Sequence, residues 1–453
     1  RGLGDLTKSG LDLVQSAPVG WLYLEKIFVE IAGNTDFNMR ILSVVFYILM
    51  LVEIVYIMKA IVRAYYVFPA VSFASALPLL LQYSNVFKPY IADAFFCLGV
   101  IIIYDLYVKG KLNIYVTAAI WVIIIWFSAP GCFIIGGCLL IELIFALVDR
   151  NRKGIFNSIK AAVIVLIGFV IYYVYWLSKV DSGMSGWWKD SSFPLIPKSI
   201  EDLVHAKDLI HTLLGEFYRF EWLILILLIV ALIYGIYRKK KVIITIYAGF
   251  LVALFASFIG MYPINRRLWV FAYPLIIVVI FEFINDFLLE GKKRIDRIIV
   301  AILMIMLTLL NSGIYYYMNE EHVYWPGYEV KGEVEYLKEV IDKKDNVYVL
   351  ACARPMFLYY NDYDENKLLD KDNNVLLGKE SFSDKTILNQ DSLVDHSEEY
   401  DYILNSDKCY IVASDSWDDV TQYGKLFDRL KSEGKLSIVY NEYDTPLLLF
   451  QKR

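Results

Sequence analysis

Histidine and cysteine are scarce in this sequence of 453 residues, which has four of the first and five of the second. The histidines are scattered, and the cysteines show no CxxC or Cys/His ligand spacing, so a zinc site has no support. The cysteines are Cys97, Cys132, Cys138, Cys352 and Cys409. A concentrated basic face is also missing at a net charge of -5, which argues against nucleic acid as a partner. There is no initiator Met and no recognisable signal peptide.

Apolar residues are abundant instead. Hydrophobic residues make up 58% of the chain and aromatic residues 16%, with a mean hydropathy of +0.49. A soluble protein of this size does not need so much apolar surface, so we expect lipid to solvate most of it. Runs long enough for a membrane helix predict ten spans, at 42–62, 66–83, 90–107, 112–127, 131–148, 158–178, 221–237, 241–261, 267–288 and 297–317.

The basic residues between these spans predict the orientation. One set of links holds fifteen lysines and arginines, and the alternate short links hold only three, Lys88, Arg266 and Arg267. Because cytoplasmic links carry the excess of Lys and Arg, the first set is predicted to be cytoplasmic. The fifteen are Lys59, Arg63, Lys109, Lys111, Arg150, Arg152, Lys153, Arg238, Lys239, Lys240, Lys241, Lys292, Lys293, Arg294 and Arg297.

The predicted fold class is a polytopic α-helical membrane protein with a small C-terminal α/β domain outside the cytoplasm. Residues 1–41 are expected to form an outer loop and an interfacial helix, and 42–317 the transmembrane bundle with a long outer loop at 179–220. From 318 to 453, helical periodicity ("VKGEVEYLKEVIDK", "WDDVTQYGKLFDRLKSEG") alternates with buried strands ("NVYVLACA", "KCYIVAS"). Cys352 and Cys409 lie in these strands, and whether they pair as a disulfide stays open.

Two arginines in "YPINRRLWVFAYP", Arg266 and Arg267, lie at the outer face against the positive-inside trend. They are either interfacial anchors that extend to water or ligands of an anion, and the planar guanidinium binds phosphate oxygens in pairs. A second outer link, "YSNVFKPYIAD", brings Lys88, Tyr90 and Asp93 together at the start of a span. Lys88 and Asp93 either pair with each other, or Lys88 meets a lipid phosphate while Asp93 orients it or contacts substrate.

Other polar features have simpler alternatives. Trp187 and Trp188, in "SGWWKDSSFPLIP", suit interfacial anchoring as well as sugar stacking. The helix-like stretch "IEDLVHAKDLIHTLLGEF" follows in the same outer loop. An Asp-x-Asp in "NDYDEN" (361–366) is expected to be a solvated loop rather than a metal site.

Five motifs in order resemble the GT-C class of membrane glycosyltransferases, which includes protein O-mannosyltransferases and aminoarabinose transferases. The first is a Q-x-A-P-x-G-x-L pattern at Gln15, Ala17, Pro18, Gly20 and Leu22, and Arg40 in "FNMRILSVV" follows it. The others are "KPYIAD", "YPINRRLWVFAYP" and the strand and turn "VYVLACARPMFLYY". Each motif is degenerate alone, and the resemblance covers most of the chain.

The resemblance implies an inverting transfer of a sugar from a polyprenyl-phosphate donor to a lipid, glycan or protein acceptor, outside the plasma membrane. Arg267, with Arg266 and Lys88, would hold the donor phosphate, and Tyr90, Asp93 and Gln15 would contact substrate. The family's catalytic Asp would precede Arg1, because Asp5 and Asp12 do not match its position, so the chain is interpreted as N-terminally truncated. The resemblance leaves open whether a divalent ion, Mg²⁺ or Mn²⁺, takes part.

Two rival functions belong to other classes. A transporter or flippase predicts charged residues along a central path, or inverted repeats with broken helices, and the sequence shows neither of these patterns. A non-catalytic membrane scaffold would use the outer domain to bind a partner.

Overall fold

The computed structural model describes residues 17–62, 66–179, 191–194, 196–215, 217, 221–288, 294–318, 330–342, 345–350, 353–361, 374–377, 397–413, 424–442 and 445–452. The chain divides into two compact units, Arg1–Asn319 and Glu320–Arg453. Each unit is described by itself.

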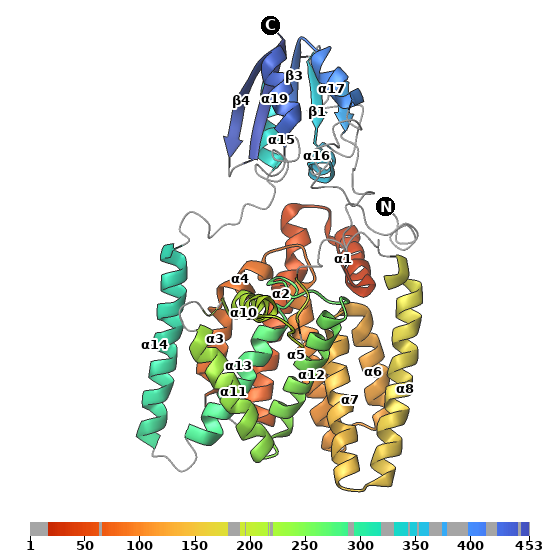
Figure 1. Cartoon of the computed structure of the whole chain (residues 1–453), viewed down its shortest axis with the longest axis vertical. Helices are drawn as coiled ribbons and strands as arrows, with labels where there is room; N and C mark the ends of the chain where they lie inside the picture. The colour runs from red at the N-terminus through yellow and green to blue at the C-terminus, as the bar shows by residue number, and fades with distance from the viewer. Residues whose placement is uncertain are drawn as a thin grey trace. The chain divides into compact units, whose positions relative to one another are not determined.

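Helices make up the described part of the first unit (Figure 1). They are α1 (Val19–Ala32), α2 (Asp36–Tyr56), the π-helix η1 (Ile57–Ile61), α3 (Val67–Ser75), α4 (Pro78–Ser84), α5 (Tyr90–Val108), α6 (Ile114–Phe127), α7 (Gly131–Val148), α8 (Arg152–Tyr175), the 3₁₀ turn η2 (Leu177–Lys179), α10 (Ile200–Leu214), α11 (Glu221–Tyr237), α12 (Lys241–Phe258), α13 (Ala272–Phe283), the π-helix η5 (Ile284–Leu288) and α14 (Arg294–Met318).

Five of these helices are long and apolar enough to cross a membrane, by length and composition, in the part of the chain that the structure describes. They are α2 extended by η1, α5, α7, α8 and α12, and α6 and α11 are apolar but shorter. Ten spans therefore stay a prediction for the remaining segments. Side-chain caps fix several starts, because Asn113 accepts hydrogen bonds from two amides of α6, and Asn151 accepts one from α8.

The predicted span over 66–83 is interrupted by a break. The segment forms α3 and α4, which are bent by 64° at the break. Pro78 begins α4, and Leu77 before it has extended backbone angles, as steric contact with a proline ring requires. The Ser75 carbonyl, at the break, accepts a hydrogen bond of 2.9 Å from the Tyr47 hydroxyl. A broken helix, which the sequence analysis did not find, is therefore present.

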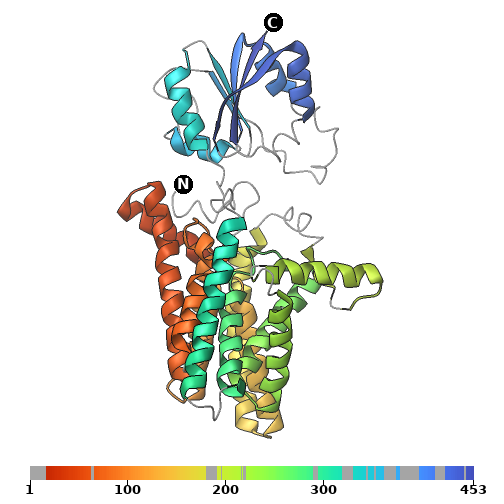
Figure 2. The same cartoon turned by 90° about the vertical axis from the view of Figure 1, so that its left-hand side faces the viewer.

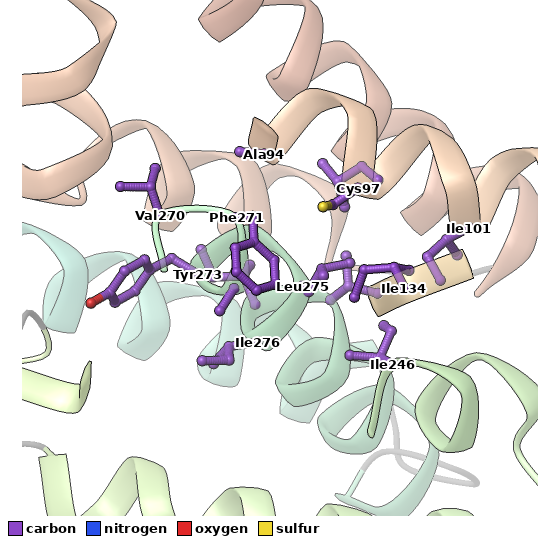
Figure 3. Close-up of a cluster of buried hydrophobic side chains, with 14 of the residues drawn as sticks. Ala94, Cys97, Ile101, Ile134, Ile246, Val270, Phe271, Tyr273, Leu275 and Ile276 are labelled. Atoms are coloured by element: carbon purple, nitrogen blue, oxygen red, sulfur yellow. The ribbon is translucent and has the colours of Figure 1, made fainter. Parts of the chain in front are cut away.

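The predicted span over 267–288 also begins later than expected. Residues 267–271 form turns, and α13 starts at Ala272. All twelve residues of α13 are buried, so this helix occupies the centre of the bundle. Its side chains and those of the preceding turn, such as Phe271 and Leu275, lie among Cys97 of α5, Ile134 of α7 and Ile246 of α12 (Figure 3).

Glycines allow close contact between α7 and α12. A Cβ atom on Gly137 would lie 2.3 Å from the backbone nitrogen of Gly249, and one on Gly249 would lie 2.7 Å from Ile134. Without a hydrophobic force between helices in lipid, such close backbone packing contributes much of the association energy.

Helix α1 is attached to the end of α8. The Trp176 indole donates a hydrogen bond of 2.9 Å to the Ala17 carbonyl, and the Tyr23 and Tyr175 hydroxyls lie 3.1 Å apart. A Cβ on Gly20 would meet the Phe127 ring at 2.9 Å, so α1 packs directly against the end of α6. The sequence prediction of a helix at this position is confirmed, while its location in the membrane interface stays a prediction.

The second unit is a five-stranded sheet with helices on both faces. Its strands are β1 (Asn346–Val349), β2 (Asn374–Leu377), β3 (Lys408–Val412), β4 (Gly434–Glu442) and β5 (Thr445–Lys452), in the order β2-β1-β3-β5-β4. β2, β1 and β3 are parallel, and β5 is antiparallel to β3 and β4. Asn346 pairs with Asn374 on one side and Cys409 on the other. In edge strand β4, the register shifts between Ile438 and Tyr440.

Strand side chains alternate between two cores. Val347 and Val349 pack with α15 (Val330–Val340) and α16 (Arg354–Tyr360), whereas Tyr348 packs with α17 (Ser397–Leu404) and α19 (Gly424–Glu433). Figure 2 shows helices on both sides of this sheet. The predicted strands at β1 and β3 and the helix at α15 are confirmed. The segment "RPMFLYY" was predicted to be a turn, and this is wrong because it forms the helix α16. Pro355 lies in the first turn of that helix, where proline is well tolerated.

Candidate functional site

Lys88, Tyr90 and Asp93 lie at the start of α5, where a short link joins it to α4. The link is held to α2 by the Ser43 hydroxyl, which donates a hydrogen bond of 2.7 Å to the Val86 carbonyl. The Lys88 amide donates to the same carbonyl at 2.7 Å, which closes a tight turn. Pro89 precedes the first residue of α5, and its carbonyl accepts the first helical bond, from Asp93. Lys88 therefore lies just before α5, and Tyr90 and Asp93 lie in its first turn.

Arg266 and Arg267 occupy the link between α12 and α13. Asn265 organises this link, because its side-chain oxygen accepts a hydrogen bond of 3.1 Å from the Arg267 amide and its carbonyl accepts from Trp269. The Tyr262 hydroxyl donates to the Leu268 carbonyl at 2.6 Å. Both arginine side chains are exposed.

The two links meet. Burial lowers the pKa of the Lys88 ammonium group, and the nearby Arg267 guanidinium lowers it further. Arg267 also acts electrostatically on the Tyr90 phenol, as does Asp93. The Tyr90 ring packs edge-on against Tyr83 of α4, with ring centroids 5.0 Å apart. Tertiary structure therefore brings Lys88, Tyr90, Asp93 and Arg267 together from opposite halves of the bundle sequence.

Asp93 lies beneath these groups and is only 6% exposed. Ser128, before α7, is the side chain with which its carboxyl interacts most directly, and Tyr262 faces it from the arginine link. Its Oδ1 atom has no hydrogen-bond partner in the described part of the chain. The carboxyl therefore keeps hydrogen-bonding capacity at a place with little water.

Lys88 and Asp93, two residues that the structure describes, do not form an ion pair with each other. Asp93 is not among the groups that act on the Lys88 ammonium, and Lys88 is not among those that act on the Asp93 carboxyl. Arg266 lies on the same turn as Arg267, and Arg40 is exposed on α2. Gln15, Asp5, Asp12, Trp187, Trp188, Cys352 and the Asp-x-Asp of 361–366 lie outside the described residues. Cys409 is buried in β3 as a free thiol.

Two contributors were missed by the sequence analysis. Ser128 precedes α7 in an otherwise apolar stretch, and a lone polar residue there was the available signal. The segment 191–194 covers the arginine link: the Ile264 amide donates to the Ser191 carbonyl at 2.7 Å, and the Phe193 amide donates to the Ser257 hydroxyl at 3.0 Å. The His205 ring of α10 contacts the Ser192 carbonyl at 3.2 Å.

Whether a divalent cation takes part stays a prediction. No group of three or more His, Cys, Asp or Glu side chains among them is arranged to hold a metal ion. Asp93 alone would supply one carboxylate, fewer oxygen ligands than Mg²⁺ or Mn²⁺ needs from the protein and substrate together.

Comparison with known proteins gives distant structural matches. No protein-family model and no curated protein matches the sequence. The structure of ArnT from Cupriavidus metallidurans bound to undecaprenyl phosphate aligns with a TM-score of 0.49 and 9% identity, covering 95% of this chain and 87% of that chain. The apo state of the same protein aligns with a TM-score of 0.40 and 10% identity, covering 99% and 91%. Likeness this loose does not assign a reaction, so the function must rest on the residues of this chain.

Proposed function

We propose that this chain is a membrane glycosyltransferase that moves a sugar from a polyprenyl-phosphate-linked donor to an acceptor at the extracytoplasmic face. The observation that carries the proposal is the meeting of Lys88 and Arg267 at one end of the bundle. Two cations near each other, one of them half-buried, create a positive potential that attracts an anion. A phosphate between them would interact favourably with both charges.

The chemistry of a donor phosphate suits these two side chains. In the transfer, the phosphate leaves the sugar and its negative charge grows, so fixed cations stabilise the transition state. The Arg267 guanidinium would bind two phosphate oxygens at once, while the Lys88 ammonium acts as a point charge. The exposed Arg266 would add to the positive potential at the mouth.

Tyr90 and Asp93 would contact the sugar beside the phosphate. The Tyr90 phenol lies within electrostatic range of both Arg267 and Asp93. The unpartnered Asp93 Oδ1 would accept a hydrogen bond from a sugar hydroxyl. The described residues assign no group to the role of the base that deprotonates the acceptor.

The test is binding of undecaprenyl phosphate to the purified protein, measured by native mass spectrometry in detergent. Arg267→Ala and Lys88→Ala are each expected to weaken binding by about tenfold or more, because each removes a charge-assisted hydrogen bond. Arg267→Lys should weaken it too, since lysine lacks the fork.

Arg152→Ala is the matched control, because Arg152 is exposed at the start of α8 and its link carries the predicted cytoplasmic charges. It should bind like wild type. Because Arg267 is exposed, its replacement should not affect folding. Equal affinity of wild type and Arg267→Ala for undecaprenyl phosphate would overturn the proposal.

A transporter is the second candidate, and the bent pair α3–α4 favours it because transporters use broken helices. Reconstituted vesicles with a fluorescent polyprenyl phosphate separate the two functions. Movement of the lipid across the bilayer would indicate a flippase, and transfer of its sugar to an added acceptor would indicate the enzyme.

A further inference from the structure

Helix α10 lies across the long helices of the first unit, and Figure 2 shows it in light green at one end of the bundle. Its second half is attached to the bundle, because Leu209 and Leu214 are buried. The Tyr273 hydroxyl, in the first turn of α13, donates a hydrogen bond of 2.7 Å to the Leu213 carbonyl. Since α13 directly follows the arginine link, α10 lies at the end of the bundle that is predicted to face outward.

The first half of α10 exposes an apolar face. Ile200, Leu203 and Val204 are 80%, 56% and 51% exposed, and their spacing of i, i+3 and i+4 places them on one side of the helix. Leu209 comes about two and a half turns after Ile200, so it lies on the opposite side. The helix is therefore apolar on two faces, and the bundle covers one of them.

Charged residues surround the exposed apolar face in a pattern that is typical of the membrane interface. Lys207 continues the face one turn beyond Leu203 and Val204, and the apolar stem of a lysine allows its ammonium group to reach lipid phosphates. Glu201 and Asp208 are exposed on one flank of the helix, away from the apolar face. An apolar face with a charged flank indicates a helix that lies in the plane of the interface.

The start of α10 satisfies its own backbone. The Ser199 hydroxyl accepts a hydrogen bond of 3.1 Å from the Asp202 amide. The Asp202 carboxylate accepts in return from the Ser199 amide at 3.1 Å and from the Lys198 amide at 2.7 Å. This capping box leaves fewer amides for water to satisfy, which favours a helix end at an interface with little water.

The exposed face continues onto α11. A small pocket at the junction of the two helices is lined by Ile210, His211, Leu214, Glu221, Trp222 and Leu225. The His211 Nδ1 and Glu221 Oε2 atoms lie 2.6 Å apart and join the helices at this place. On α11, the apolar side chains of Trp222, Leu223 and Ile226 are exposed, and tryptophan is enriched where lipid meets water. One apolar surface therefore extends from α11 to α10.

We propose that the face of Ile200, Leu203 and Val204 inserts into the outer leaflet of the lipid bilayer, so that α10 lies in the membrane interface. A lipid surface matches this face, because it removes the apolar area of the three side chains from water. Insertion would also hold the segment 191–194, which covers the arginine link and whose Ser192 carbonyl contacts the His205 ring of α10. It depends neither on binding of a phosphate nor on the transfer reaction.

The test is electron paramagnetic resonance on the full-length protein in vesicles of phosphatidylcholine and phosphatidylglycerol. Leu203→Cys carries a nitroxide label, and power saturation compares its collisions with oxygen, which concentrates in lipid, and with a nickel chelate, which stays in water. We expect oxygen to dominate at Leu203 and the nickel chelate to dominate in the matched control Asp208→Cys, because Asp208 is exposed on the flank of the same helix. Labelled wild type gives the background of the native cysteines.

Ile200→Cys provides a second reading and should match Leu203→Cys. More collisions with the nickel chelate than with oxygen at these two positions would mean that water covers the face, and protection from both reagents would mean that protein covers it. Either result would contradict the proposal. The same labels in an Arg267→Ala background should report an unchanged depth, because insertion needs no phosphate. Failure of the phosphate site and failure of insertion are therefore distinguished.

Discussion

At the residue scale, Lys88 combines a half-buried ammonium group with a second cation nearby. A lysine in such surroundings gives up its proton more readily than one in water, for which the pKa is about 10.4. The charge that the proposed phosphate site needs is therefore lost at a lower pH than usual.

This shift predicts the pH dependence of undecaprenyl phosphate binding. A basic group with a lowered pKa is charged below that pKa and neutral above it, so affinity should fall as pH rises, beginning below about pH 10.4. Lys88→Arg should keep its affinity over the same range, because arginine stays protonated. Binding titrations of both proteins between about pH 7 and about pH 10.4 check this. Parallel profiles would contradict a role for the Lys88 charge.

Local sequence predicted part of this site. The spacing of Lys88, Tyr90 and Asp93 placed them on one turn and one helix start, where the structure has them. The approach of Arg267 depends on how α13 packs in the bundle, and periodicity along one segment contains no information about that. Ser128 was missed because its contact with Asp93 joins two helices whose relative rotation the sequence does not specify.

At the element scale, the long apolar runs predicted most helices because an isolated span must satisfy its own backbone hydrogen bonds. The two departures from the predicted spans have local causes. Pro78 was a visible signal for the α3–α4 break, and the run of apolar residues around it concealed that signal. In the arginine link, apolar residues 268–271 form buried turns, so hydropathy alone extended the span to Arg267.

The contact between α7 and α12 predicts a strong effect of one methyl group. In Gly137→Ala, the new Cβ would lie 2.3 Å from the Gly249 backbone, so the helices must separate. We expect a loss of about 1–3 kcal/mol in unfolding free energy and a lower midpoint of thermal unfolding in detergent.

Gly313→Ala in α14 is the control, because a Cβ there meets nothing within 4 Å. Alanine is also the better helix former, so this variant should match or exceed wild type. Equal unfolding temperatures for the Gly137 and Gly313 variants would show that α7 and α12 do not pack this closely.

At the scale of the whole molecule, each of the two units has its own hydrophobic core, and their surfaces differ. The first exposes many large apolar side chains, such as Ile171 and Val174 of α8, which suit a lipid environment. The second keeps its apolar residues between sheet and helices. The composition change near residue 318 indicated this division, whereas the strand order could not be derived from local patterns.

Link charges predict which end of the bundle faces the cytoplasm. Asn85→Cys, in the link that carries Lys88, is expected to react with a membrane-impermeant maleimide on intact cells. Arg152→Cys should react only after the cells are permeabilised. The wild-type chain provides the background, because Cys132 is only partly buried while Cys97, Cys138 and Cys409 are buried. The opposite pattern would reverse the predicted orientation.

The register shift in β4 has a consequence for how copies of this protein meet. An edge strand with an unbroken row of free backbone groups is a template for strands of other molecules. One extra residue, Val439, interrupts that row between Ile438 and Tyr440, and the bulge increases the local twist. The sheet thus has a built-in obstacle to polymerisation through this edge, which protects a domain whose exposed Ile438 would otherwise favour aggregation.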